Sequence, residues 1–244
     1  MTQNPIDLSL VIPCYNDGAL LMDSLAEIHR VMDQTQYTYE LIVIDDCSPD
    51  GSAATVRALA KQDNTIRCVC HETNVGRGGT VAEGFRAARG IFVGYLDIDL
   101  EVHCRYIPSM LAALEQGADG ATAFRIYKFH YSPSIMYRGC LSIFYRKMVR
   151  FLLHLPFEDT ETGFKFFKRE KIIPLLDRCQ SQGWFWDTEI MAWMHYSGFR
   201  VKEIPALFLR RWDKPSTVKP LQDSIQYLRE LLRFRRRLNQ AGKR

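Results

Sequence analysis

The sequence predicts a single α/β domain with a mostly parallel central sheet. From residue 8 to about residue 126, short segments rich in valine and isoleucine alternate with segments of helical periodicity, a pattern typical of successive βαβ units. The valine- and isoleucine-rich segments are apolar on both faces, as in strands that have helices on either side. With 244 residues and 47% hydrophobic side chains, the chain is large enough to form one sizeable core.

We expect five strands in this region and four helices between them. The strands span residues 8–13, 40–45, 65–70, 91–98 and 121–126. The helices span residues 19–33, 52–62, 79–88 and 105–116. The second helix follows the turn SPDGS, whose serine and aspartate side chains are suitable helix caps.

The regular alternation ends after residue 126. We expect a long helix of apolar and basic residues over 134–155 and a late strand over 200–209. The final segment has arginines beside a row of aliphatic residues at helical spacing: Leu221, Ile225, Leu228 and Leu232. We therefore assign residues 1–220 to the main domain and residues 221–244 to a basic amphipathic helix, which either belongs to that domain or faces a membrane.

The charge of the chain is small but unevenly distributed. A formal net charge of +4 does not indicate a nucleic-acid partner. No acidic residue occurs between Asp119 and Glu158, whereas six lysines and arginines fall in that interval. Basic and bulky apolar residues are mixed over 135–155, as in helices that lie on anionic bilayers, although most amphipathic helices pack on their own domain. Peripheral membrane contact is therefore one of two open interpretations.

The cysteines and the N-terminal segment indicate a cytoplasmic protein. Seven cysteines occur without a CxxC pair and in an odd number, which favours neither a zinc site nor a complete disulfide framework. Reduced thiols are the simpler interpretation. The N-terminus lacks the features of a signal peptide, and no segment is apolar enough to span a membrane. We expect a protein that is soluble in the cytoplasm or peripheral at the cytoplasmic membrane face.

The strongest functional signal is LDID, in which Asp97 and Asp99 follow an apolar strand. Open α/β sheets bind ligands at the edge where the carboxyl ends of their strands meet the loops. These carboxylates, extended by Glu101, could converge on Mg²⁺ or Mn²⁺, which prefer oxygen ligands and leave positions for substrate phosphates. An isolated pair of this kind is more often a solvated strand end.

Three other predicted strand ends also carry ligand-type residues. They occur in IPCYND, DDCSPDGS and HETNVGRGGT. Asp46 could accept hydrogen bonds from a base or ribose, and the glycines around Arg77 would let the backbone approach a phosphate at a helix start. Turn formation and helix capping explain each segment by itself, but four such strand ends together favour one ligand site.

The segments IPCYND, DDCSPDGS, NVGRGGT and LDIDLEVHCRYIP, in this order and spacing, resemble the inverting family 2 glycosyltransferases. Within that family they are most similar to dolichol-phosphate mannosyltransferases and bacterial polyprenyl-phosphate glycosyltransferases. The resemblance extends over about residues 8–212 and implies a GT-A nucleotide-diphospho-sugar transferase fold. Asp17 and Thr80 replace the glutamate and alanine that are usual in the family.

The resemblance also implies roles for individual residues. The donor nucleotide would contact Pro13, Tyr15, Asn16, Asp17, Asp46, Gly76, Arg77, Gly78 and Asp97. A Mn²⁺ or Mg²⁺ ion would be held by Asp97, Asp99 and Glu101. The catalytic and acceptor-side residues would be Asp97, Asp99, Arg125, Arg138, Ser142, Asp159, Asp187 and Glu189. The arginines suit a phosphate because guanidinium binds its oxygens bidentately, and a solvated basic helix face is the alternative.

We predict a metal-dependent inverting enzyme that moves a hexose from a UDP- or GDP-linked sugar to polyprenyl phosphate. The basic segment without acids favours this acceptor, because a phosphate is already anionic and needs no general base. One alternative is a soluble family 2 enzyme that glycosylates a saccharide or protein hydroxyl, with Asp159, Asp187 or Glu189 as the base. Another is a non-catalytic nucleotide-sugar-binding subunit.

Overall fold

Seven strands form one sheet in the computed structural model, which describes residues 5–127, 145–211 and 220–241. They are β1 (Leu8–Cys14), β2 (Tyr39–Asp45), β3 (Ile66–Cys70), β4 (Phe92–Leu96), β5 (Gly120–Tyr127), β6 (Phe164–Lys168) and β7 (Val201–Phe208). The strand order is β3-β2-β1-β4-β6-β5-β7, in which β6 pairs antiparallel with both of its neighbours and the other pairings are parallel. The predicted mostly parallel sheet is confirmed.

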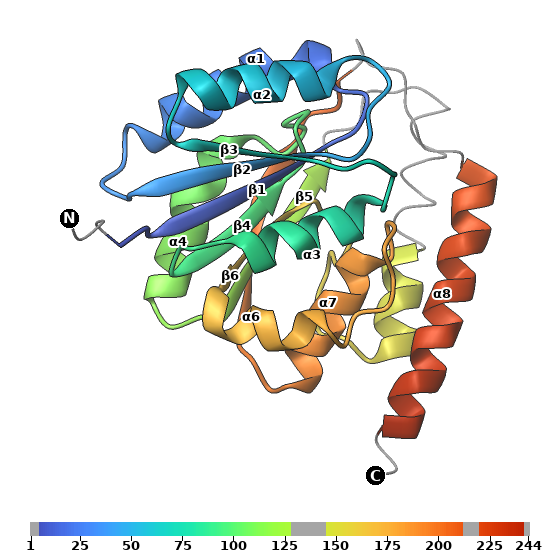
Figure 1. Cartoon of the computed structure of the whole chain (residues 1–244). Coiled ribbons are helices and arrows are strands. Elements are labelled where there is room, and N and C mark those ends of the chain that lie inside the picture. The colour runs from blue at the N-terminus through green and yellow to red at the C-terminus, as the bar shows by residue number, and fades with distance from the viewer. Residues whose placement is uncertain (1–4, 128–144, 212–219, 242–244) are drawn as a thin grey trace.

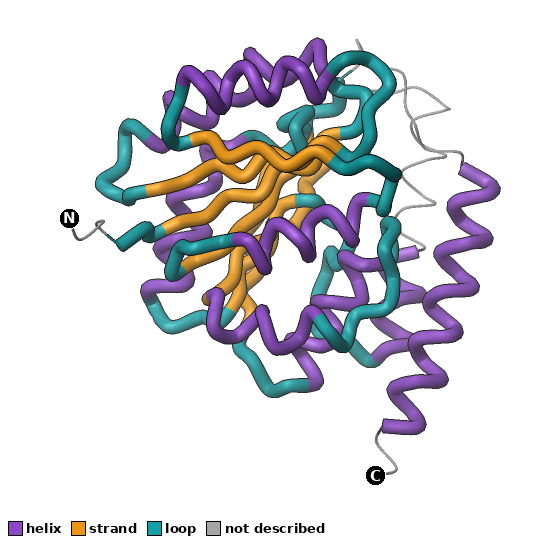
Figure 2. The backbone as a smooth tube through the Cα atoms, viewed as in Figure 1, coloured by secondary structure: helices purple, strands orange, loops and turns teal. Residues whose placement is uncertain are grey.

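Helices cover both faces of the sheet (Figures 1 and 2). One core contains α1 (Gly18–Met32), α2 (Ser52–Gln62) and α4 (Ile107–Glu115), which follows the short 3₁₀ helix η1 (Cys104–Tyr106). The other contains α3 (Arg77–Ala87), α6 (Arg169–Leu176), α7 (Trp186–Tyr196), a helix over 145–153 and α8 (Pro220–Ala241). Leu10 and Ile12 belong to the first core and Val11 to the second, because successive side chains of a strand point to opposite faces.

The predicted elements up to residue 126 are all present, and their ends shift by a few residues. The strand predicted to reach residue 98 ends at Leu96, because the chain turns directly afterwards. The N–H of Leu100 donates to the carbonyl of Asp97 at 3.1 Å, and Leu100 has a φ of 53°. This turn follows β4 directly and contains Asp97 and Asp99.

Strand β6 and helix α6 are among the elements that the sequence periodicity does not predict. Strand β6 has five residues, FKFFK, and its two lysines interrupt the apolar pattern. Helix α6 contains Pro174, a residue that usually argues against a helix interior. Of the long helix predicted over 134–155, the structure shows residues 145–153 as helical, and residues 128–144 lie outside the described ranges.

Helix α8 packs on α7 through one of its faces. Leu231 and Phe234 are fully buried, and the Phe234 ring lies 5.4 Å from Trp193 and 5.9 Å from Phe185, measured between ring centroids. At the other side of this contact, Arg237 donates to Glu189 at 2.6 Å. The C-terminal helix is therefore attached to the main domain.

The predictions about cysteines and membrane spans can be compared with the described residues. The six cysteines in these ranges have free thiols. None of the helices in residues 5–127, 145–211 and 220–241 combines the length and hydrophobicity that a bilayer crossing requires.

We predict that Phe234→Ala lowers the free energy of unfolding by about 3 to 5 kcal/mol, because it removes a buried aromatic ring and leaves a cavity under α8. Leu232→Ala is the matched control on the same helix, since Leu232 is 42% exposed, and it should change stability by about 0.5 kcal/mol or less. Urea unfolding of both variants measures the difference. Equal effects would mean that α8 does not pack as described.

Candidate functional site

Asp97 lies at the carboxyl end of β4, beside the residue that precedes β6. Because β4 and β6 are antiparallel, with Leu96 opposite Phe164, the N–H of Asp97 reaches the carbonyl of Gly163 at 3.1 Å. A β-carbon at position 163 would collide with the Asp97 carboxylate and the Arg77 guanidinium. Gly163 therefore leaves the space in which these two charged groups meet.

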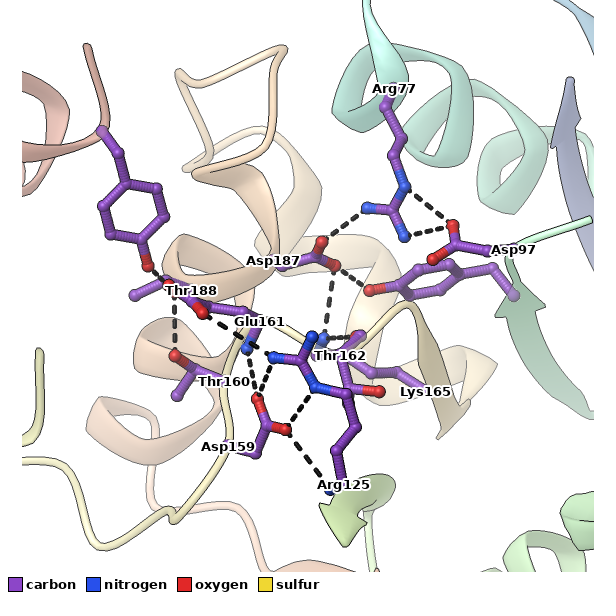
Figure 3. Close-up of polar contacts among 12 residues, drawn as sticks. Arg77, Asp97, Arg125, Asp159, Thr160, Glu161, Thr162, Lys165, Asp187 and Thr188 are labelled. Carbon is purple, nitrogen blue, oxygen red and sulfur yellow. Dashed lines mark hydrogen bonds and ion pairs between the residues drawn. The ribbon is translucent and has the colours of Figure 1, made fainter. Parts of the chain in front are cut away.

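Arg77 joins Asp97 to Asp187 (Figure 3). Its Nε and Nη2 donate to Oδ1 of Asp97 at 2.9 and 2.6 Å, and its Nη1 donates to Oδ2 of Asp187. The guanidinium also lies over the rings of Tyr95 and Trp184, at 5.4 and 5.2 Å from their centroids. Burial disfavours the charge, but Asp187 and Asp97 outweigh burial and raise the pKa of Arg77. The residue is a permanent cation between two carboxylates.

Asp187 is almost fully buried and receives two more donors on its other oxygen. Lys165 Nζ lies 3.2 Å from Oδ1, and the Tyr95 hydroxyl donates to the same atom. Tyr95 and Lys165 are opposite one another in the β4–β6 pairing, so their side chains reach the same face. Burial lowers the pKa of Lys165, and Asp187 opposes that shift. Sequence reasoning missed Lys165, for which the signal was a lysine inside an apolar segment.

A second charged cluster lies beside the first, on β5 and the loop before β6. Arg125 donates to both carboxylate oxygens of Asp159, at 2.6 and 2.9 Å. Nη1 of Arg146 lies 3.9 Å from Oδ2 of Asp159. Asp159 is 0% exposed. Burial acts to raise the pKa of Asp159, but Arg125 and then Arg146 hold it below its ordinary value. The structure thus brings Arg125 and Asp159 together, as a tight ion pair.

Glu189 makes its contacts away from these clusters, and its predicted catalytic role stays a prediction. Its carboxylate is buried and accepts the N–H groups of Gln180 and Ser181 at 3.1 and 2.8 Å, in addition to Arg237. Because all of these partners come from the loop before α7 and from α8, Glu189 fixes the C-terminal helix. Arg138 and Ser142, also predicted on the acceptor side, lie outside the described residues.

The loop before α3 is held by bonds within the protein, and the predicted contacts of Asp46, Gly76 and Gly78 with a donor stay a prediction. Asp46 is 4% exposed and accepts the N–H groups of Val75 and Gly76 at 2.8 and 2.9 Å. The N–H of Gly78 donates to the carbonyl of Gln182 at 2.7 Å. Asp46 therefore shapes this loop, and the amides of Gly76 and Gly78 do not point to a free anion site.

The remaining predicted donor residues lie at the end of β1. Pro13 is within β1. Tyr15, the first residue after this strand, is 47% exposed. Asn16 has a φ of 58°, and its N–H donates to Ser48 at 2.9 Å. Asp17 precedes α1. Since β1 lies between β2 and β4, these residues and Asp97 share one edge of the sheet, and their contact with a nucleotide stays a prediction.

Asp97, Asp99 and Glu101 are the predicted ligands of a divalent cation, and only their contacts within the protein are described by the structure. Within the described residues, Asp97, Asp99 and Glu101 do not bring one carboxylate oxygen each within 4.8 Å of one another. Glu101 instead accepts the N–H of Arg211 at 3.1 Å, and burial raises its pKa. The role of Glu101 as a metal ligand stays a prediction. Mg²⁺ usually binds through one or two carboxylates, with phosphate and water oxygens completing its shell, so Asp97 and Asp99 suffice.

Comparison with known proteins identifies the family. Residues 9–176 match the sequence model of the family Glycosyl transferase family 2. The chain belongs to glycosyl transferase family 2. It is 30% identical to glycosyltransferase AglD of Haloferax volcanii over 203 residues. The aligned region covers 82% of this chain and 32% of AglD. It is 24% identical over 224 residues to the dolichyl-phosphate beta-glucosyltransferase of Saccharomyces cerevisiae, covering 82% of this chain and 66% of the yeast protein.

A solved structure shows the same fold. Glucosyl-3-phosphoglycerate synthase from Mycobacterium tuberculosis, in complex with Mn²⁺, uridine diphosphate and glucosyl-3-phosphoglycerate, superposes with a TM-score of 0.68 at 18% identity. The match covers 94% of this chain and 78% of the synthase. The GT-A fold that the sequence resemblance implied is therefore confirmed.

We predict that Gly163→Ala displaces Asp97 and Arg77. The overpacking should lower the free energy of unfolding by about 1 to 3 kcal/mol. The same change should abolish the rise in melting temperature that Mn²⁺ causes. Gly183→Ala is the matched control, because a β-carbon there meets nothing within 4 Å. Thermal unfolding with and without Mn²⁺ measures both effects. A full response to Mn²⁺ in Gly163→Ala would contradict the placement of the ion at Asp97.

We predict that ionised Asp159 stabilises the fold at pH values above about 3.9, the pKa of an aspartate in an unfolded chain. Because its folded pKa is lower still, this contribution is present at neutral pH and is lost as the pH falls through the folded pKa. Asp159→Asn should cost about 3 to 5 kcal/mol at pH 7, since it leaves buried arginine charge unpaired. The cost should shrink in acid.

Urea unfolding between neutral and acidic pH measures this difference. Asp177→Asn is the control, because the Asp177 side chain is 83% exposed and its loss should change stability by about 0.5 kcal/mol or less. A cost for Asp159→Asn that does not vary with pH would show that its charge is not the stabilising feature.

Proposed function

We propose that this protein is a metal-dependent inverting glycosyltransferase that transfers a hexose from a UDP- or GDP-linked sugar to polyprenyl phosphate. Membership of family 2 and the similarity to the yeast dolichyl-phosphate beta-glucosyltransferase support the reaction class. The uridine diphosphate and Mn²⁺ bound to the mycobacterial synthase support the donor class and the cation.

The ion pairs and the burial of the three candidate general bases support a phosphate acceptor. Asp159 is held by Arg125, Asp187 by Arg77 and Lys165, and Glu189 by Arg237. All three carboxylates are at most 1% exposed. A hydroxyl acceptor needs a base within hydrogen-bond reach of its proton, and none of these three is free to serve. A phosphate acceptor is already anionic at neutral pH and requires no base.

The charged groups of the site then have distinct tasks. When bound, the divalent cation would neutralise charge that develops on the leaving nucleotide diphosphate, and Asp97 and Asp99 are the residues that would hold it. Arg77 fixes the direction of the Asp97 carboxylate through two hydrogen bonds. Arg125 and Arg146 supply positive charge next to Asp159, and this charge would stabilise the negative charge of an acceptor phosphate.

We predict that purified protein labels polyprenyl phosphate from one of three radiolabelled donors, UDP-glucose, GDP-mannose or UDP-N-acetylglucosamine, in the presence of Mn²⁺. Asp99→Asn should reduce transfer by about a hundredfold or more, as expected when charge stabilisation of the leaving group is lost. Asp23→Asn, an exposed aspartate of α1, is the control and should retain full activity. Failure of every donor to label lipid would overturn the proposal.

A second comparison separates phosphate from hydroxyl acceptors. With a phosphate acceptor, Arg138→Ala should reduce transfer by about a hundredfold, because a charge-assisted bidentate contact is lost. With a saccharide or protein hydroxyl as acceptor, the same change should leave transfer nearly intact. Arg105→Ala, an exposed arginine of η1, is the control. Nucleotide-sugar binding without transfer to any acceptor would instead identify a non-catalytic subunit.

A further inference from the structure

Helix α8 carries two apolar rows, and the main domain covers one of them. The inner row consists of Leu231 and Phe234, both 0% exposed, with Tyr227 and Leu238 packed against the same core. The outer row consists of Ile225, Leu228 and Leu232, which are 52%, 38% and 42% exposed. Because the inner row already holds the helix in place, the outer row is not needed for folding.

The outer face of α8 is also uniformly basic. Arg229, Arg233 and Arg236 are exposed beside the outer row. The single acidic residue of segment 225–241 is Glu230, and it points inward, where Ser181 donates to its carboxylate at 2.7 Å. Arg237 likewise points inward, to Glu189. Segment 225–241 therefore directs its single acid toward the protein and leaves arginines around an exposed aliphatic row.

We infer that this outer face, defined by Ile225, Leu228, Leu232, Arg229, Arg233 and Arg236, docks on the surface of an anionic lipid bilayer. Aliphatic side chains flanked by arginines enter the boundary between headgroups and acyl chains while the guanidinium groups contact lipid phosphates. Anionic headgroups provide the complementary charge. A second copy of the chain is a poor occupant, because pairing two such faces would bring six arginines together.

The docked face also lies close to the functional site. On the inner side of the same helix, the Tyr227 hydroxyl is 2.6 Å from the hydroxyl of Thr188, which adjoins Asp187. A helix with its side chains is about 10 Å across, so the bilayer surface would lie about one helix diameter from this contact. The inference does not require the proposed acceptor, since lipid binding is measured without a donor sugar.

Cosedimentation of the full chain with vesicles tests the inference. We expect strong binding to phosphatidylcholine vesicles that contain phosphatidylglycerol and weak binding to phosphatidylcholine alone. Each basic residue near an anionic surface contributes about fivefold to binding, so Arg229→Glu with Arg233→Glu should weaken it about twenty-five-fold or more. Leu228→Ser with Leu232→Ser should weaken it too, at unchanged melting temperature because both side chains are exposed.

Two control variants match these changes elsewhere on the surface. Arg57→Glu with Lys61→Glu reverses two exposed charges four residues apart on α2, and Met22→Ser removes an apolar side chain of α1 that is 56% exposed. Both should bind vesicles as the unaltered protein does. Binding that is independent of anionic lipid, or unaffected by both α8 variants, would overturn the inference.

Self-association is the remaining outcome to distinguish. If the unaltered protein is a dimer in lipid-free buffer, and Leu228→Ser with Leu232→Ser makes it a monomer, the outer row is an interface between copies and the bilayer assignment is wrong. Polyprenyl transfer in detergent is expected to persist in both α8 variants, so a failure of membrane docking and a failure of the proposed activity give different results.

Discussion

The site depends on one buried cation, Arg77, that is shared by two carboxylates from distant parts of the chain. Asp97 follows β4 and Asp187 lies in the first turn of α7. The guanidinium at the start of α3 bonds to both. Removing either carboxylate would leave buried charge unpaired, which costs several kcal/mol. The ion pairs therefore fix the relative positions of three elements that the hydrophobic cores alone would hold less specifically, and Gly163 leaves the room they need.

The same pairing logic explains why the site favours an acceptor that is already charged. Every candidate base is matched by a guanidinium or an ammonium group, and a carboxylate held in that way is a poor proton acceptor because protonation would break the ion pair. The cluster can orient anions and offset their charge, but it is not arranged to remove a proton. Because these groups are buried and paired, their orientation is fixed and they are poor general acids or bases.

The sequence predicts the sheet and the edge that carries the site, because periodicity and strand-end residues are local signals. It places Asp97, Asp99 and the β1 residues correctly on one edge. It does not predict what Asp46, Glu101 and Glu189 contact, since the direction of a carboxylate depends on loops distant in the sequence. It also misses Lys165, whose partner Asp187 is 22 residues away and is brought close by the antiparallel insertion of β6.

The two bonds from Arg77 to Asp97 end on the same oxygen, Oδ1. The side chain of Asp97 is 39% exposed, whereas that of Arg77 is 12% exposed, so the more accessible partner of the pair is the carboxylate. A divalent cation could therefore reach Oδ2 without displacing the guanidinium. Arg77 would then compensate part of the carboxylate charge, which would weaken cation binding by the protein alone, and the phosphate oxygens of a donor would strengthen it.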